Sequence, residues 1–579
     1  MPSPLTIITT LLIVYLTSYI YRLIRNYLLA RKSGFPYFIV PWEQDHIIWM
    51  IISVPLRPWL KKNLPTFIYN RLVLTIYGFE FTEKLRMFQE YGGQDVQSYV
   101  MVTVGKYEFS TRDPELATEI LRRTRDFQQQ DAIGVVLDRF GKNLLSSDGE
   151  DWVRQRRVVA STLNERISKT IFEESVKQTE GLLGDVGGGE VTGKLFDGMK
   201  KITINVLTGA GMGESVAWRE DEDEGVKGKG GYRMSYIECV KVVIECVAGP
   251  IVLPKWFLEW YPSFAPGSDL LRRLNVAVEE FPRHTWELLD KEKQRMQHGS
   301  GESRSNIISQ LLKASEDFEG EKKGGKALSD DEMLGNLFIF MGAGFDTTAN
   351  TLSFALVLLA RHPEWQDWLF TEIDDILPPP GSELSYTALL PKVTRILALM
   401  FETLRLYTPL IHLAKQTRAE QTITTSSGKT FWFPKNATVY VNTVAIHMDE
   451  KVYRNINLKP GEESKDNDEL LFRPTRWLNA DNTTLWTAPK GSFIPWSAGP
   501  RVCPGQKMAQ VEFVSIFLRL FGEFRLEAVP LKGETRREVE ERLDARMQES
   551  FSILTLQMKD LYNVDEEEKG VRVRLVRRK

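Results

Sequence analysis

The segment from residue 330 to residue 362 contains no proline, and it constrains the fold of this chain more than any other feature. Ser329 and Glu332 have the spacing of a capping box, which places Ser329 at the N-cap of a helix. Apolar residues continue at helical spacing until Pro363 ends the run. A helix of roughly 30 residues is roughly 45 Å long, so it must cross the core of the protein.

A second segment, Phe493–Gly505, holds a single cysteine between glycine and proline turns. Such turns can direct peptide N–H groups at the sulfur of Cys503, and Arg501 adds positive charge nearby. Both effects would lower the pKa of the thiol and favour a thiolate bound to a metal. Haem iron is the metal most often served by one protein thiolate, because the porphyrin fills the in-plane positions. A lone cysteine can also be a small buried apolar residue, but the surrounding turn residues favour the metal site.

The composition indicates a globular protein whose cysteines are in the reduced state. Of the 579 residues 42% are hydrophobic and 26% are charged, and the net charge of −3 gives no reason to expect a nucleic-acid partner. The three cysteines, Cys239, Cys246 and Cys503, are too few for a disulfide scaffold and fit the cytosol. Cys239 and Cys246 lie in apolar helical surroundings, which favours packing over metal binding.

The N-terminus departs from this soluble composition. The uncharged segment Leu5–Tyr21 is just long enough to cross a bilayer, and basic residues follow it, which favours a retained anchor with a cytosolic body over a cleaved signal peptide. We therefore expect an anchor at residues 1–25, a basic and proline-containing linker at 26–59, and a catalytic domain at 60–579. The apolar run His46–Leu56 is too short to span a membrane.

The body reads as mainly helical with small β-sheets. Strand-like alternation is confined to Tyr99–Glu108 and Thr422–Tyr440, and the second of these contains Ser427-Gly428, a hairpin turn signal. We detect no internal repeat.

The middle of the long helix carries the sequence Ala343-Gly344-Phe345-Asp346-Thr347-Thr348. The small residues Ala343 and Gly344 would let a flat ligand approach the backbone. Thr347 can bond a carbonyl one turn back and open the helix locally, which would form a polar notch. A carboxylic acid beside an alcohol in such a notch can deliver protons. The alternative is a solvated helix face with one packing glycine.

Two further charged motifs flank this helix in the sequence. Glu402 and Arg405 are neighbours on one face of an apolar helix, and Arg476 is the expected third member of a buried charged triad that fixes the segment before the cysteine loop. Trp152 and Arg156 lie four residues apart on another helix, where an indole and a guanidinium can donate to a carboxylate such as a haem propionate. Core packing and surface exposure are the alternatives for this pair.

Taken in order, these four motifs resemble those of the cytochrome P-450 superfamily, and the anchor matches its microsomal members. The resemblance covers residues from about 60 to the end and implies the P-450 fold. It implies that Cys503 is the proximal ligand of haem b and that Asp346 and Thr347 serve oxygen protonation. It further implies a structural triad and a set of propionate contacts: Glu402, Arg405 and Arg476 for the triad; Trp152, Arg156, Arg501 and, as a weaker candidate, Lys415 for the propionates.

The resemblance also implies the reaction, the partners and the location. One oxygen atom of O₂ would be inserted into a C–H or C=C bond of a lipophilic molecule, and the other would leave as water. Electrons would come from a membrane-bound NADPH-dependent reductase, with cytochrome b5 as a possible second donor, at the endoplasmic reticulum membrane. The pocket implied by analogy is mainly apolar: Phe338, Ala343, Phe345, Leu410 and His412.

The substrate stays open at this level. The cysteine loop is similar to that of filamentous-fungal members, which favours a tailoring step in secondary metabolism, and hydroxylation of fatty acids or xenobiotics is the alternative. Two other functions compete: an isomerase or peroxygenase on the same scaffold that needs no reductase, and a non-catalytic membrane haem protein. Two features depart from the family pattern: Trp496 replaces the usual phenylalanine seven residues before the cysteine, and residues 531–546 form a charged stretch whose role the sequence does not reveal.

Overall fold

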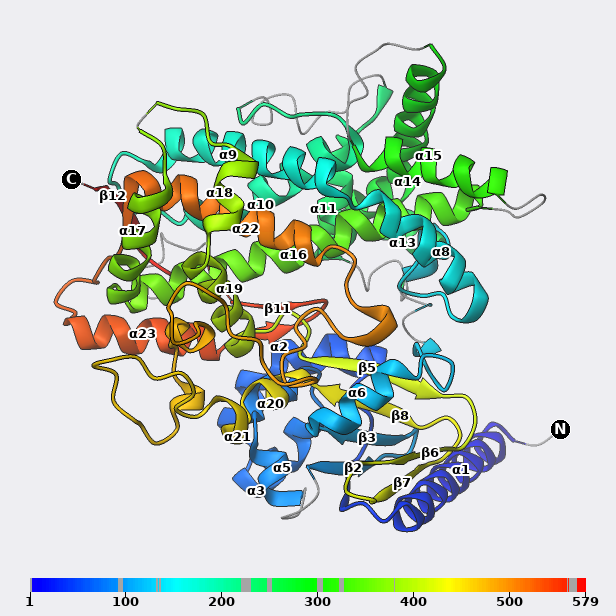
Figure 1. The fold of residues 1–579 in the computed structure, drawn as a ribbon. Coiled ribbons are helices and arrows are strands. Elements are labelled where there is room, and N and C mark those ends of the chain that lie inside the picture. The colour runs from blue at the N-terminus through cyan, green and yellow to red at the C-terminus, as the bar shows by residue number, and fades with distance from the viewer. Residues whose placement is uncertain are drawn as a thin grey trace.

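The computed structural model describes residues 3–91, 97–131, 134, 137–219, 231–246, 253–298, 306–321, 327–379, 381–559, 561 and 570–578. Long helices fill one side of the molecule, and a twisted β-sheet lies on the other side beside the N-terminal helix (Figure 1). This arrangement confirms the predicted class, mainly α with small sheets.

The main sheet is mixed and has the strand order β1-β2-β3-β8-β5-β4. β1 is parallel to β2 and β3 is parallel to β8, whereas the β2–β3, β8–β5 and β5–β4 pairs are antiparallel. Every residue of β2, β3 and β8 is buried, because these strands have structure on both faces. The strands of this sheet are β1 (Tyr37–Ile39), β2 (Ser98–Val102), β3 (Tyr107–Thr111), β4 (Phe127–Gln128), β5 (His412–Thr417) and β8 (Thr438–Asn442).

Three two-stranded sheets complete the β structure. The predicted hairpin around Ser427-Gly428 is confirmed: two strands pair antiparallel, and Gly428 takes a positive φ of 77° that a glycine adopts without strain. The six strands are β6 (Gln421–Thr424) with β7 (Thr430–Phe433), β9 (Phe524–Ala528) with β12 (Val573–Arg577), and β10 (Phe551–Ser552) with β11 (Leu556–Gln557).

The helices fall into three groups along the chain. Those of the N-terminal part are α1 (Pro4–Ser33), α2 (Ile47–Asn63), α3 (Thr66–Leu72), α4 (Phe79–Glu83), α5 (Arg86–Tyr91) and α6 (Pro114–Arg122). Those of the middle are α8 (Gly149–Thr162), α9 (Glu165–Val186), α10 (Lys194–Leu207), α11 (Tyr236–Glu245), α13 (Lys255–Trp260), α14 (Ser268–Gln297) and α15 (Ile307–Glu321). The remainder are α16 (Asp330–Arg361), α17 (Glu364–Ile376), α18 (Tyr386–Leu389), α19 (Arg395–Leu406), α20 (Thr443–His447), α21 (Glu450–Tyr453), α22 (Gln506–Glu523) and α23 (Arg536–Gln548).

Helix α16 is the predicted long helix, and it runs through the centre of the helical part (Figure 1). The capping box is confirmed, since Ser329 accepts from the peptide N–H of Glu332 and the Glu332 side chain accepts from that of Ser329. From Thr348 to Ala360 every residue of the helix is buried. A helix that is buried all round must be surrounded by other elements, and α10, α19, α22, α23 and β9 pack against this one.

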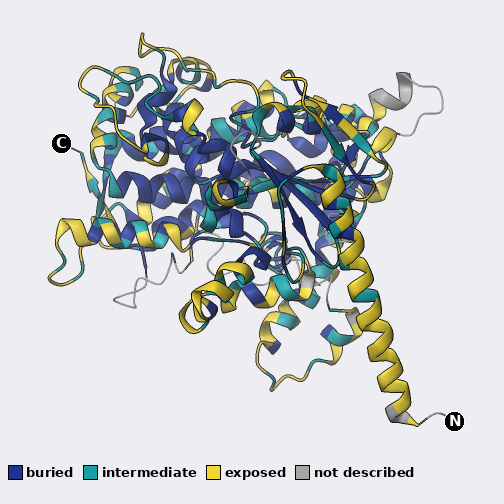
Figure 2. Ribbon diagram, turned by 90° about the horizontal axis from the view of Figure 1, so that it is seen from below, coloured by how far each residue is buried: buried dark blue, intermediate teal, exposed yellow. Residues whose placement is uncertain are grey.

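Helices α1 and α16 are long and apolar enough to cross a membrane, and that window of α16 is largely buried inside the protein. The first half of α1 points away from the body with its apolar side chains exposed (Figure 2). The second half packs on the sheet: Asn26 is buried and donates to the carbonyl of Thr103 at 2.9 Å, and Ala30 is fully buried. The expected boundary at residue 25 therefore falls within one continuous helix, and the expected linker supplies β1 and most of α2.

The charged stretch 531–546 forms most of helix α23 and the turn before it. Thr535 and Glu538 make a capping box at its start. Arg361, in the last turn of α16, forms ion pairs with Glu540 and Asp544 at 3.0 and 3.2 Å. The charges of α23 thus tie this helix to the end of the central helix.

Candidate active site

The cysteine loop is held by helix α6. Gly499 has a φ of 68°, and a side chain there would lie 2.9 Å from the carbonyl oxygen of Leu121 in α6. Gly491, just before the loop, has a φ of 83°, and a side chain there would lie even closer to the carbonyl oxygen of Pro114. Both positions need glycine for two reasons, the left-handed backbone and the close approach of α6.

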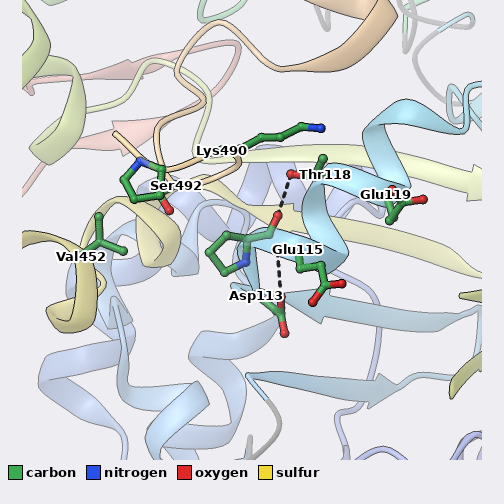
Figure 3. Close-up of a pocket in the computed structure, with 9 residues that line it drawn as sticks. Asp113, Glu115, Thr118, Glu119, Val452, Lys490 and Ser492 are labelled. Carbon is green, nitrogen blue, oxygen red and sulfur yellow. Dashed lines mark hydrogen bonds between the residues drawn. The ribbon is translucent and has the colours of Figure 1, made fainter. Parts of the chain in front are cut away.

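A surface pocket of about 510 Å³ lies where α6 begins against this same segment. Glu115 and Glu119 of α6 and the N-cap residue Asp113 line it on one side, and Lys490 and Ser492 line it from the chain that leads to the cysteine loop (Figure 3). None of the site residues predicted from the sequence lines this pocket.

The backbone around Cys503 directs hydrogen-bond donors at its sulfur. The peptide N–H of Cys503 itself bonds the carbonyl of Trp496 at 2.8 Å, which closes the loop. Cys503 is exposed at the surface of the loop, but the atoms packed around it raise the pKa of its thiol by desolvation. The N–H groups of Gly505 and Gln506 and the charge of Arg156 oppose that rise. The predicted peptide donors are therefore present, and they stabilise an anionic sulfur.

Arg501 reaches from the cysteine loop to the segment just before α8. It donates to the carbonyl of Ser147 at 2.7 Å and pairs with Asp148, and its guanidinium lies 4.7 Å from the ring centre of Trp152. The charge that acts on Cys503 comes instead from Arg156, one turn along α8 from Trp152. The Nε atom of Arg501 is buried and has no hydrogen-bond partner among the described residues.

Lys415 lies next to Arg501 in the interior. Its ammonium donates to the side-chain oxygen of Gln129 at 2.7 Å. Burial and, to a smaller extent, the charge of Arg501 lower the pKa of Lys415 to about 7, and the charge of Asp148 opposes them. Two buried cations thus share one carboxylate, so the surroundings favour an additional anion.

The acid and the alcohol of α16 are both in place, in an uninterrupted helix. Thr347 donates to the carbonyl of Ala343 at 2.7 Å, as predicted, but the helix stays α-helical through this segment, so the expected local opening is not seen. The expectation for Gly344 is also corrected: a side chain there would meet Leu207 of α10 at 3.0 Å, so its small size serves helix packing. Ala343 keeps an exposed surface.

Asp346 makes contacts that sequence reasoning missed. Its carboxylate accepts hydrogen bonds from Asn350 at 3.1 Å and from the hydroxyl of Thr555, which lies between β10 and β11. Burial raises the pKa of Asp346, and the Thr555 hydrogen bond, the charge of Lys200 and the Asn350 hydrogen bond oppose the rise. The spacing of Asn350, four residues on, could have indicated its contact, whereas nothing in the sequence points to Thr555.

The three charged residues expected in a triad lie together, fully buried. Both oxygens of Glu402 accept from Arg405, at 2.8 and 2.9 Å, and one of them accepts from Arg476 at 3.0 Å. The sequence did not reveal two further members, Trp477, which donates to Glu402 at 2.9 Å, and Asp468, which pairs with Arg476 at 3.0 Å.

The triad is connected to the cysteine loop through one histidine. Arg405 donates to the carbonyl of His447 at 3.0 Å, and the Nε2 atom of His447 accepts from the peptide N–H of Ile494 at 2.9 Å. Burial and the charge of Arg405 lower the pKa of His447 to about 3, so the ring is neutral and can accept this bond. The ion network therefore positions the start of the cysteine loop.

The five predicted pocket residues lie in different environments. Phe338 and Phe345 are buried, and Phe338 packs against Phe140 with ring centres 4.8 Å apart. Leu410 is 39% exposed. The Nδ1 atom of His412 lies 2.8 Å from the Glu80 carboxylate oxygen, which accepts a hydrogen bond from it. His412 lies on the face of β5 opposite to Lys415, because the two are an odd number of residues apart.

Comparison with known proteins agrees with this arrangement. The family model "Cytochrome P450" matches residues 65–550. The crystal structure of the cytochrome P450DA heme domain has the same fold, with a TM-score of 0.63 at 18% identity over 94% of this chain and 98% of that chain. The fold is therefore that of cytochrome P450 proteins.

Two curated fungal relatives extend this result. A "Phomenoic acid biosynthesis cluster cytochrome P450 monooxygenase" from Leptosphaeria maculans is 35% identical over 94% of this chain and 95% of its own length. A cytochrome P450 monooxygenase from Arthrobotrys oligospora is 28% identical over 91% and 92%. The chain belongs to the cytochrome P450 family and is a cytochrome P450 monooxygenase.

The residues around Cys503 fit the haem that the family implies. A haem-thiolate site would need one cysteine thiolate for the iron and hydrogen-bond donors for the two propionates. The Nε atom of Arg501, which is buried and has no hydrogen-bond partner among the residues that the structure describes, and the ammonium of Lys415 would supply donors. Arg156 adds a positive charge that acts on the sulfur.

Trp496, which stands where the family usually has phenylalanine, packs among aromatic rings. Its ring lies edge-on to Phe401 and Phe493, with ring centres 5.9 and 6.2 Å away. Among the hydrogen bonds of the described residues, none joins its indole to the sulfur of Cys503. Trp496 thus contributes an aromatic wall beside the loop.

Replacing Lys415 by methionine should have opposite effects on the two forms of the protein. Without haem, the variant should be more stable than the wild type below about pH 7, because burying a charged lysine costs free energy, and this gain should vanish as the pH rises toward the ordinary lysine pKa of about 10.4. With haem, loss of one charge-assisted hydrogen bond of about 1.5 kcal/mol should speed haem release about tenfold. Thermal unfolding against pH and haem transfer to apomyoglobin measure the two effects. Equal haem release from both proteins would contradict the propionate contact.

Proposed function

We propose that this chain is a haem-thiolate monooxygenase that inserts one oxygen atom into a lipophilic small molecule, as a tailoring step in fungal secondary metabolism. The observation that carries the proposal is the environment of Cys503, where the peptide N–H groups of Gly505 and Gln506 and the positive charge of Arg156 act to lower the pKa of the thiol. The extended similarity to a relative named for a biosynthesis cluster supports the metabolic setting.

Each residue of the site then has a defined task. Cys503 binds the iron as a thiolate, and the haem, when bound, supplies the activation of O₂. Lys415, Arg501, Trp152 and Arg156 hold the propionate edge, and the Glu402 network keeps the loop in position. Asp346 holds an exchangeable proton, and Thr347 offers a hydroxyl on the next position of the helix. Ala343 leaves room beside the backbone.

The electron source and the location follow from the same proposal. An NADPH-dependent reductase in the same membrane would supply electrons, with cytochrome b5 as a second possible donor. The apolar, exposed first half of α1 supports anchoring, and exposed Trp256, Trp260 and Phe264 add an apolar surface around α13. We propose a single-pass protein of the endoplasmic reticulum with residues 60–579 as its cytosolic catalytic domain.

Replacing Thr347 by alanine should divert the reaction from product to peroxide. Loss of the hydroxyl removes a proton-handling group, and general acid catalysis of this kind contributes about 10²-fold or more. We expect NADPH consumption to continue while the product formed per NADPH falls at least tenfold. Turnover of the wild type with reductase and NADPH, with peroxide and product both quantified, measures the ratio. Unchanged coupling would remove Thr347 from the mechanism.

The same assay distinguishes the competing functions. An isomerase or peroxygenase on this scaffold would convert its substrate without NADPH and reductase, and a non-catalytic haem protein would consume neither NADPH nor substrate. Metabolite profiles of the source organism with and without the gene supply the substrate for the assay.

A further inference from the structure

Asp346, Asn350 and Thr555 form a closed ring of hydrogen bonds. The amide of Asn350 donates to Asp346 at 3.1 Å and lies 3.0 Å from the hydroxyl of Thr555. That hydroxyl bonds the second carboxylate oxygen of Asp346. Asn350 and Thr555 are both at least 95% buried, so water does not compete for these contacts.

The ring directs the Asp346 carboxylate away from its neighbour in the sequence. Both of its oxygens are engaged by Asn350 and Thr555, and the Thr347 hydroxyl is engaged with the carbonyl of Ala343. No hydrogen bond joins the two side chains in the described part of the chain. Side chains at adjacent helix positions do not face each other, so Asp346 must change rotamer before it can share a proton with Thr347.

Thr555 belongs to a hairpin that touches the apolar interior. Its next residue, Leu556, begins β11 and donates its peptide N–H to the carbonyl of Pro409 at 2.9 Å. On the other side, Leu554 packs against the apolar cluster that contains Phe338 and Phe345. Ile553 is 41% exposed, although it is a large apolar residue. The connecting residues between β10 and β11 thus link the proposed substrate pocket to the carboxylate.

We propose that Thr555 is a positioning residue that holds Asp346 turned away from Thr347, and that a ligand in contact with Ile553 and Leu554 shifts the hairpin and frees the carboxylate. This inference rests on the proposed function of Asp346 and Thr347. As a consequence, Asp346 delivers protons only when the ligand is bound, and the protein without ligand transfers few electrons to peroxide. Lys200 of α10 is the charged group that also acts on Asp346.

The first test reads the carboxyl group directly and needs no turnover. Infrared difference spectra of the haem-loaded protein, assigned with Asp346→Asn, follow protonation of Asp346 against pH. Because Thr555→Val removes a donor to the carboxylate, the midpoint should rise by about one pH unit. Thr555→Ser, which keeps the hydroxyl, should restore the wild-type midpoint. Thr179→Val is the matched control, because Thr179 is a buried threonine whose hydroxyl donates to the Ser175 carbonyl at 2.6 Å.

The second test measures NADPH oxidation by the reconstituted protein with reductase and no substrate. Thr555→Val should raise this rate and the peroxide yield several-fold, and Thr555→Ser and Thr179→Val should not. If the midpoint and the substrate-free rate are both unchanged in Thr555→Val, the positioning role is overturned. If the wild type itself lacks the thiolate-type carbonyl spectrum, the proposed function fails instead, and the infrared midpoint still reports whether Thr555 holds Asp346.

Discussion

Replacing Cys503 by serine should abolish the thiolate-type spectrum of the reduced carbonyl complex and with it all oxygenation. A serine hydroxyl is a much poorer iron ligand than a thiolate, and the two peptide donors that face the sulfur cannot compensate for the change of atom. The measurement is the absorption spectrum of the reduced, carbonyl-bound protein, together with haem content.

A matched control separates this effect from general damage. Cys246, which is only partly buried near the end of α11, should tolerate serine with its spectrum unchanged. A Cys503→Ser protein that keeps the thiolate-type spectrum would mean that another residue binds the iron.

The second large effect concerns stability. Glu402→Gln leaves Arg405 and Arg476 buried with one carboxylate fewer, and breaking a buried ion pair in this way costs about 3–5 kcal/mol. The variant should unfold at much lower urea concentration, or fail to accumulate as folded protein. Glu541→Gln, which breaks an exposed pair with Arg537 on α23, should change the midpoint little. A Glu402→Gln midpoint equal to that of the control would show that the network is dispensable.

The same residue predicts how stability depends on pH. Burial alone would raise the pKa of Glu402, but the charges of Arg405 and Arg476 and the hydrogen bonds lower it to about 2. A carboxylate whose pKa is lower in the folded protein than in the unfolded chain stabilises the fold. This stabilisation is fully present above the ordinary glutamate pKa of about 4.3 and is lost as the pH falls toward 2. The stability gap between wild type and Glu402→Gln should therefore narrow in that window, as urea unfolding at successive pH values would measure.

Features set by neighbours in the sequence were predictable. The capping box of Ser329 and Glu332 defines the start of α16, because both hydrogen bonds lie within one helical turn. The same holds for the hairpin at Gly428, which needs only a left-handed residue, and for the contact between Glu402 and Arg405. In each case local geometry leaves one favoured arrangement.

Features set by distant parts of the chain were not predictable. Thr555 reaches Asp346 across 209 positions, and Gln129 reaches Lys415 across 286. Arg501 was expected beside the sulfur because it is two residues away, yet Trp152 and Asp148 draw it to α8, and Arg156 takes its place. Spacing along the chain carries no information on such packing.

The way α1 joins the body has a practical consequence for orientation. Because Asn26, Ala30 and Lys32 dock this helix on Thr103 and Trp432, a bilayer that holds its first half would hold the whole molecule at one angle rather than on a loose tether. A shortened protein for crystallisation should therefore begin before Leu23, which also packs against the sheet. Such a truncation removes exposed apolar side chains and keeps the turns of α1 that contact the body.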